Sequence, residues 1–196
     1  DCVPDRSFFG FCENMLDQFR DDKSIWMING FNPKHQGIKT SKIFLSQNPS
    51  CWGWASWRDR WEKYDVNILS SKNQNLRLYG NIPKYVYQYY EDAFENTHNG
   101  TINSWDYQLT WLILINCGFV IKPYSNLISN IGTHGTHVAN KSHPNYHTKV
   151  GSFFKKNIYE LKFDSNEDLW FYKTRMKKSV IFYILNKIKK IKRLFS

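Results

Sequence analysis

The chain has 196 residues, of which 41% are hydrophobic and 22% are charged. This length allows one domain with an appendage, and this balance excludes a chain that is disordered throughout. No run of about 18 apolar residues occurs, so we expect no membrane-spanning helix. The formal net charge of +10 at first suggests a nucleic-acid-binding protein.

The positive charge is concentrated at the C-terminal end of the chain. The last 26 residues hold nine Lys and Arg and no acidic residue. The first 170 residues hold 18 basic and 17 acidic residues, so they are almost neutral. We therefore expect no specific nucleic-acid binding by the main body of the chain.

The first half of the chain predicts two helices and one buried strand. A helix opened by Pro4 is expected to run to about residue 19, because apolar side chains recur along one of its faces. The apolar run 24–28 predicts a buried strand. Residues 32–50 lack a clear period and predict a long loop, after which residues 56–64 predict a second helix.

The second half alternates helices with strands. Two helices are expected over 83–96 and over about 103–116, the second one ended by Gly118. A strand over 119–122 and a further apolar run over 127–131 follow, and a polar loop over 134–147 contains four His. This alternation predicts a layered α/β domain over residues 1–150, with residues 151–172 as a connector.

Residues 173–196 predict a basic amphipathic helix. Isoleucines at steps of three and four share one side of this helix, and lysines share the other. Such a helix suits an anionic membrane surface, and the candidate contact residues are Lys187, Lys189, Lys190, Lys192 and Arg193. Two alternatives stay open: the isoleucines pack on the domain with the lysines solvated, or the tail binds nucleic acid.

Asp106 is the candidate catalytic residue. It stands in the block Ser104-Trp105-Asp106-Tyr107-Gln108, directly before a strongly apolar helix. The first turn of a helix favours an ionised carboxylate, because the positive end of the helix dipole lies there. An acidic residue in a first turn is also ordinary helix-end chemistry, so its position alone does not indicate catalysis.

Four blocks together resemble a family of enzymes. Asp1-Cys2-Val3-Pro4 resembles the segment that ends an acidic metal-binding motif, and the second block is Cys51-Trp52-Gly53-Trp54-Ala55-Ser56-Trp57-Arg58. The block around Asp106 is the third, and the segment from Asn126 to His137 is the fourth. In this order they resemble a bacterial branch of the GT-A nucleotide-sugar glycosyltransferases, over roughly residues 1–140.

The resemblance implies an α/β GT-A fold and sugar transfer from a nucleotide-sugar donor to a glycan or lipid-linked acceptor. It implies that Asp106 is the base that deprotonates the acceptor hydroxyl. Asp1 and His137 would hold Mn²⁺ or Mg²⁺ at the diphosphate. The acceptor sugar would stack on the wall formed by Trp52, Gly53 and Trp54. Such an enzyme would be cytoplasmic, at the inner face of the cell membrane.

The sequence also departs from this family. The N-terminal half that binds the nucleotide is missing, and the acidic motif is reduced to one Asp, so the chain is expected to be a fragment on the acceptor side. The tryptophans could instead belong to the core, and Asp1 could be a frayed terminus. A zinc site at His134, His137, His143 and His147 is a further alternative. The rival to an enzyme is a non-catalytic carbohydrate-binding or interaction module.

Overall fold

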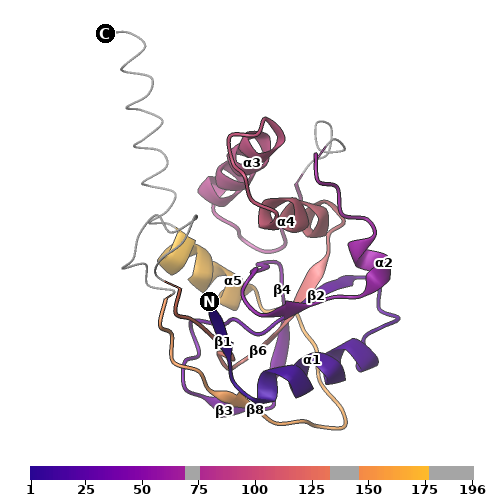
Figure 1. The fold of residues 1–196 in the computed structure, drawn as a ribbon, viewed down its shortest axis with the longest axis vertical. Helices are drawn as coiled ribbons and strands as arrows, with labels where there is room; N and C mark the ends of the chain where they lie inside the picture. Colours follow the sequence, from indigo (N-terminus) through magenta and orange to yellow (C-terminus); the bar gives the residue numbers. More distant parts are fainter. Residues whose placement is uncertain (69–75, 133–145, 177–196) are drawn as a thin grey trace.

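The computed structural model describes residues 1–68, 76–132 and 146–176, and these residues form a mixed α/β fold (Figure 1). The described helices are α1 (Ser7–Gln18), α2 (Arg58–Trp61), α3 (Lys84–His98), α4 (Asp106–Ile115), α5 (Ser165–Phe171) and a π-helical turn (Tyr172–Met176). The described strands are β1 (Cys2–Pro4), β2 (Ile25–Asn29), β3 (Lys39–Thr40), β4 (Ile43–Ser46), β5 (Trp54–Ala55), β6 (Phe119–Pro123), β7 (Ile128–Asn130) and β8 (Ser152–Phe153).

The central sheet has the strand order β4-β6-β2-β5. Strands β2 and β6 pair in parallel, whereas β4 and β5 run antiparallel to their neighbours. The register of β2 against β6 shifts between Ile25 and Met27. Because of this irregularity, Ile25 and Ile28 both pack in the core under α1, while Met27 packs with α4 on the opposite face.

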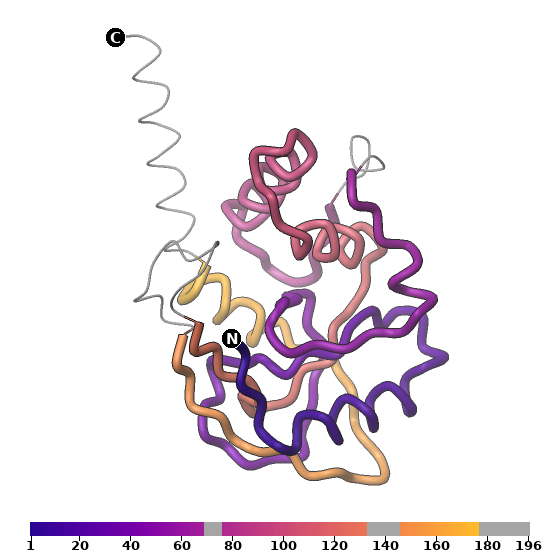
Figure 2. Tube along the Cα trace, in the orientation of Figure 1, coloured from indigo at the N-terminus to yellow at the C-terminus, as the bar shows by residue number. Residues whose placement is uncertain are grey.

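Helices cover both faces of this sheet. One core contains α1, the inner side chains of the sheet and the strands β7 and β8. A second core joins the sheet to α4, and a third lies between α3, α4 and the π-helical turn. The chain trace shows α3 and α4 together at one end of the molecule, and the N-terminal strand β1 beside β7 (Figure 2). The prediction of a layered α/β arrangement is thus confirmed.

Several predicted elements agree with the structure to within a few residues, but the prediction of a long loop over all of 32–50 is wrong. Strand β4 lies in that segment and forms the edge of the central sheet, with Ile43 opposite Pro123 and Ser46 opposite Val120. Its four residues are too few to show a period, and side chains on both of its faces are buried. Tertiary packing therefore defines this strand.

Residues 151–172 do more than connect. Strand β8 pairs in parallel with β3, and Phe153 packs edge-on against Phe11 of α1 at a ring distance of 4.8 Å. Helix α5 packs on β4, and Tyr172, which follows it, is fully buried. These residues are part of the folded domain.

Helix α5 is tied to the sheet through its two buried acidic residues. Asp168 accepts hydrogen bonds from the Ser46 hydroxyl (2.5 Å) and from the Gln47 backbone N–H (2.8 Å). Glu167 accepts from Lys34 at 2.7 Å and contacts His35 Nε2 at 3.1 Å. Burial alone would raise the pKa of Glu167, but the hydrogen bonds from His35 and Lys34 outweigh it and lower that pKa.

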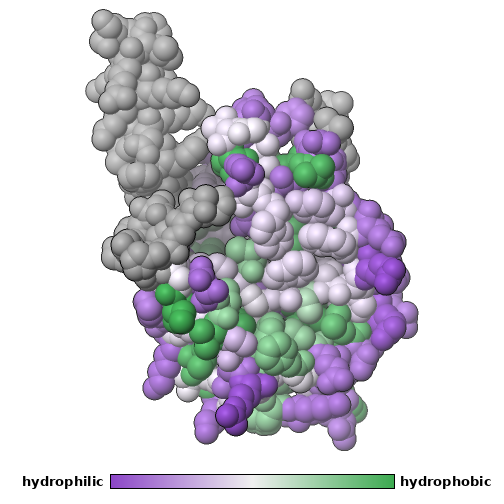
Figure 3. Space-filling model, in the orientation of Figure 1, coloured by the Kyte–Doolittle hydropathy of each residue, from purple (hydrophilic) through white to green (hydrophobic). Residues whose placement is uncertain are grey.

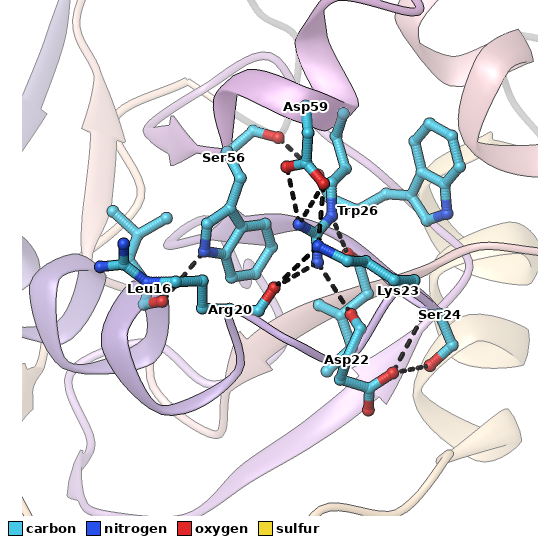
Figure 4. Close-up of polar contacts among 11 residues, drawn as sticks. Leu16, Arg20, Asp22, Lys23, Ser24, Trp26, Ser56 and Asp59 are labelled. Atoms are coloured by element: carbon cyan, nitrogen blue, oxygen red, sulfur yellow. Dashed lines mark hydrogen bonds and ion pairs between the residues drawn. The ribbon is translucent and has the colours of Figure 1, made fainter.

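A buried arginine, Arg60, fixes the short helix α2 to the turn between α1 and β2. Figure 4 labels several residues around it, including Arg20, Asp22 and Asp59. The Arg60 guanidinium donates hydrogen bonds to the carbonyls of Arg20, Asp22 and Ile25 at 2.9–3.3 Å. It also forms two bonds to the Asp59 carboxylate, at 2.7 and 2.9 Å. These bonds, together with one from Lys23, lower the pKa of Asp59 to about 2.

We expect Arg60→Lys to lower the free energy of unfolding by about 1–3 kcal/mol, because an ammonium cannot replace the five donors of a guanidinium and leaves buried carbonyls without a donor. Urea denaturation monitored by circular dichroism measures this change. The matched control is Arg58→Lys, since Arg58 is exposed on the same helix. Equal stability of the two variants would contradict a structural role for Arg60.

Among residues 1–68, 76–132 and 146–176, no helix is long and apolar enough to cross a membrane. The predicted amphipathic helix over 173–196 lies largely outside the described residues, and all five of its candidate membrane-contact residues do. Its first residues, 173–176, belong to the π-helical turn, in which Met176 is buried against the core between α3 and α4.

Candidate functional site

Asp106 is the first residue of α4 and is half-buried. The sequence predicted that this helix begins at about residue 103, and the structure begins it three residues later. In the structure Trp105 is the capping residue, without a side-chain bond to the backbone, and the Ser104 hydroxyl donates to the Asp106 carboxylate instead. The helix N-terminus therefore presents a carboxylate whose orientation is set by a neighbouring hydroxyl.

The loop at 51–54 lies against this carboxylate. Burial raises the pKa of the Cys51 thiol to about 12. The negative charge of Asp106 and a hydrogen bond between Cys51 and Asp106 raise this pKa further, and so does the nearby thiol of Cys2. The Cys2 thiol in turn interacts with the backbone N–H of Gly53. The fold thus brings together three segments that are far apart in the sequence, namely the N-terminal strand, the 51–54 loop and the start of α4.

A buried asparagine shapes the 51–54 loop. The Asn29 side chain at the end of β2 donates to the carbonyls of Ser50, Trp52 and Gly53 at 2.9–3.1 Å. Gly53 has a φ of +60°, and a Cβ atom there would lie 2.2 Å from the Ile128 side chain. Glycine is therefore required at position 53 both by the left-handed backbone and by the close contact with β7.

The two tryptophans of the predicted acceptor wall point to different surroundings. The Trp52 ring lies edge-on to Phe31, with ring centroids 4.9 Å apart, and stacks on Tyr146, with centroids 5.6 Å apart. It packs against the core under α1. Trp54 instead contacts Trp61 and Trp105, each at a ring distance of 5.6 Å. The structure therefore does not form one continuous wall from Trp52, Gly53 and Trp54.

Trp54 belongs to a group of four rings that we call the aromatic platform: Trp54, Trp61, Tyr64 and Trp105. Trp61 and Tyr64 stack at 4.8 Å, and the Tyr64 hydroxyl donates to the Trp105 carbonyl at 3.0 Å. Trp61 and Trp105 remain 42% and 44% exposed. In Figure 3, side chains of intermediate hydropathy, a class that includes Trp and Tyr, occupy the middle of the face in view.

Sequence reasoning missed three of these four rings and also missed Asn29. Trp105 directly precedes Asp106, so its position in the chain was a usable signal. Trp61 and Tyr64 are one turn apart in the region of α2, and nothing in their spacing indicates that they meet Trp54. That contact depends on the antiparallel pairing of β5 with β2 and on the path of α2 after it.

Asp1 lies at the exposed start of β1. Its backbone carbonyl accepts a hydrogen bond from Ile131 N–H at 2.9 Å, and its carboxylate fills the space beside Gly132. Its neighbour Cys2 faces the 51–54 loop. Asp1 is thus held in the described fold by the pairing of β1 with β7.

His137 lies outside the described residues, as do His134 and His143 of the alternative zinc site. His147 is described: it is exposed, and its backbone N–H donates to the Asn130 carbonyl at 2.9 Å. Within the part of the chain that the structure describes, no group of three or more His, Cys, Asp or Glu side chains is arranged to hold a metal ion.

No protein-family model, curated protein or solved structure matches the chain.

Proposed function

We propose that the chain is the acceptor-side part of a GT-A-type glycosyltransferase, which moves a sugar from a nucleotide-sugar donor to a hydroxyl of a glycan or lipid-linked acceptor. The observation that carries this proposal is the placement of the Asp106 carboxylate at the N-terminus of α4, next to the exposed ring of Trp105. The residue proposed as the base and the ring proposed to bind the sugar are thus neighbours in the chain at the start of one helix.

Each part of this arrangement has a chemical task. The apolar face of a pyranose packs on an indole ring, so the aromatic platform would orient the acceptor. Asp106 would accept the proton of the attacking hydroxyl as the bond to the donor sugar forms. Ser104 and Cys51 are positioning residues, because both hold the Asp106 carboxylate and neither needs to contact a substrate.

A divalent cation fits this proposal only in part. Mn²⁺ or Mg²⁺ would neutralise the charge that grows on the leaving nucleoside diphosphate. Asp1, with its exposed carboxylate, would supply one oxygen ligand, and His137 stays the second predicted ligand. Diphosphate oxygens would complete the coordination, since hard cations of this kind favour oxygen ligands.

A non-catalytic carbohydrate-binding module is the second candidate. The exposure of Trp61 and Trp105 favours it, because a planar aromatic surface binds sugars without any catalytic group. Both candidates require sugar binding at the aromatic platform, whereas only the enzyme requires turnover.

The test is a transfer assay on the protein encoded by the complete open reading frame, with a panel of labelled sugar nucleotides, Mn²⁺ and glycan acceptors. We expect transfer, and we expect Trp105→Ala to weaken acceptor binding about tenfold, which corresponds to roughly 1.4 kcal/mol of lost stacking. Trp170→Ala is the control, since Trp170 lies on α5 outside the platform. Glycan binding without transfer would favour the second candidate, and the absence of both would overturn the proposal.

A further inference from the structure

Strands β3 and β8 lie at the opposite end of the molecule from α3 and α4 (Figure 1). Six exposed lysines lie in these strands or in the segments that adjoin them. We call this group the basic patch: Lys39, Lys42, Lys149, Lys155, Lys156 and Lys162. Strand β3 pairs with β8, with Lys39 opposite Ser152. Further backbone bonds join Phe154 to Thr40 (3.2 Å) and Gly37 to Lys149 (3.3 Å), so the two stretches that carry the lysines are held side by side.

Few acidic groups offset this charge. Residues 149–162 contain four lysines and one acidic residue, Glu160, which pairs with Lys162. Nearby Asp164 accepts a hydrogen bond from the Tyr124 hydroxyl at 2.5 Å. Lys42, Lys156 and Lys162 also line one groove of about 490 Å³, whose lining includes both of these acidic residues, so the lysines are in excess there by one. The nearly neutral main body of the chain therefore contains a local region in which lysines outnumber acidic residues.

Large exposed apolar side chains lie in the same segments as these lysines, and one of them, Ile158, lines the same groove as Lys42, Lys156 and Lys162. Ile158 is 85% exposed and Phe154 is 54% exposed, and Ile38, directly before β3, is also exposed. Large aliphatic side chains in water lose the free energy that burial would provide, so apolar groups clustered within a charged surface indicate a partner with both apolar and anionic parts.

The turn that carries Ile158 is anchored to the core. The Tyr159 hydroxyl accepts hydrogen bonds from the Asn14 side chain and from the Lys156 backbone N–H, both at 2.8 Å. The Tyr159 ring stacks on Phe153 at 6.0 Å. With Tyr159 held inward, its neighbour Ile158 is held outward, so the apolar projection is a fixed feature of the fold.

We propose that the basic patch docks the protein on an anionic lipid bilayer. Ile158 and Phe154 enter the boundary between headgroups and acyl chains, and the lysines contact lipid phosphates. A nucleic acid would complement the charge but would leave an aliphatic side chain such as Ile158 without an apolar partner. This inference is independent of the sugar-transfer proposal, and the basic patch consists of residues other than those of the predicted tail helix.

The test is sedimentation of the full chain with vesicles of phosphatidylcholine, with or without phosphatidylglycerol. We expect at least about tenfold stronger binding to the anionic vesicles, and a decrease as salt is raised. Ile158→Ser and the double variant Lys155→Gln/Lys156→Gln should each weaken binding about fivefold, since one loses apolar insertion and the other loses two charges. All variants retain the tail, so its contribution is constant.

Two matched controls make the result specific to this surface. Val66→Ser removes a similarly exposed apolar side chain, and Lys84→Gln removes an exposed lysine, each from a different part of the fold. Neither should change vesicle binding. The proposal is overturned if the patch variants bind vesicles like the unsubstituted protein, if anionic lipid gives no advantage, or if these variants lose binding to a nucleic acid while keeping vesicle binding.

Discussion

Asp106→Asn is expected to lower the rate of sugar transfer about 10²–10⁴-fold, the range that general bases contribute. An amide keeps the shape of the carboxylate and can still accept the Ser104 hydrogen bond, but it cannot take a proton from the acceptor hydroxyl. Acceptor binding should stay unchanged, because the aromatic platform is not altered. Initial-rate kinetics of transfer together with glycan titration measure the two effects separately.

The control for this substitution is Asp17→Asn, which removes an exposed carboxylate on α1. It should leave both transfer and binding unchanged. Ser104→Ala adds a test of positioning: it should lower the rate less than Asp106→Asn does, since the base remains but is less well oriented. Unchanged transfer in the Asp106 variant would show that Asp106 is only a helix-end residue, and the enzyme proposal would lose its catalytic base.

Asp168→Ala is expected to lower the free energy of unfolding by about 2–4 kcal/mol. The substitution leaves two buried donors, the Ser46 hydroxyl and the Gln47 N–H, without their acceptor. It also removes a negative charge near the buried Lys122. Burial lowers the pKa of Lys122 to about 8, although the charges of Asp168 and Glu167 act in the opposite direction.

The stability lost in Asp168→Ala should increase as the pH falls. Burial raises the pKa of Asp168 to about 6, against the hydrogen bonds from Ser46 and Gln47 and the charge of Lys122. Between about pH 4 and pH 6 the folded protein therefore holds a proton that the unfolded chain has released, so this group adds stability as the pH falls. The difference between the unsubstituted protein and Asp168→Ala should increase by about 1 kcal/mol from pH 7 to pH 5.

Urea denaturation at pH 5, 6 and 7 measures this dependence. Asn166→Ala serves as the control, because Asn166 is exposed on the same helix and its backbone N–H, which bonds to Asp164, is retained. A difference between the unsubstituted protein and Asp168→Ala that decreases toward pH 5 would contradict the raised pKa of Asp168.

The sequence by itself determined the elements with a strong local pattern. The apolar face predicted α1, which begins at Ser7 rather than near Pro4 because the Ser7 backbone N–H and hydroxyl both bond to Asp5. The apolar run before Gly118 predicted α4, and with it the placement of Asp106 in a first helical turn. The period of α1 and the apolar run of α4 both depend on residues close together in the sequence, so local sequence contains the necessary information.

Only the tertiary structure decided how the candidate site is assembled. Trp52 and Trp54 are separated by one residue, but they pack against different cores. Gly53, between them, turns the backbone with a positive φ. Strand β4 exists because β6 provides a partner, and Trp61 and Trp105 meet Trp54 through contacts between distant segments. Such contacts depend on pairing and packing across the fold, which the spacing of residues along one chain does not encode.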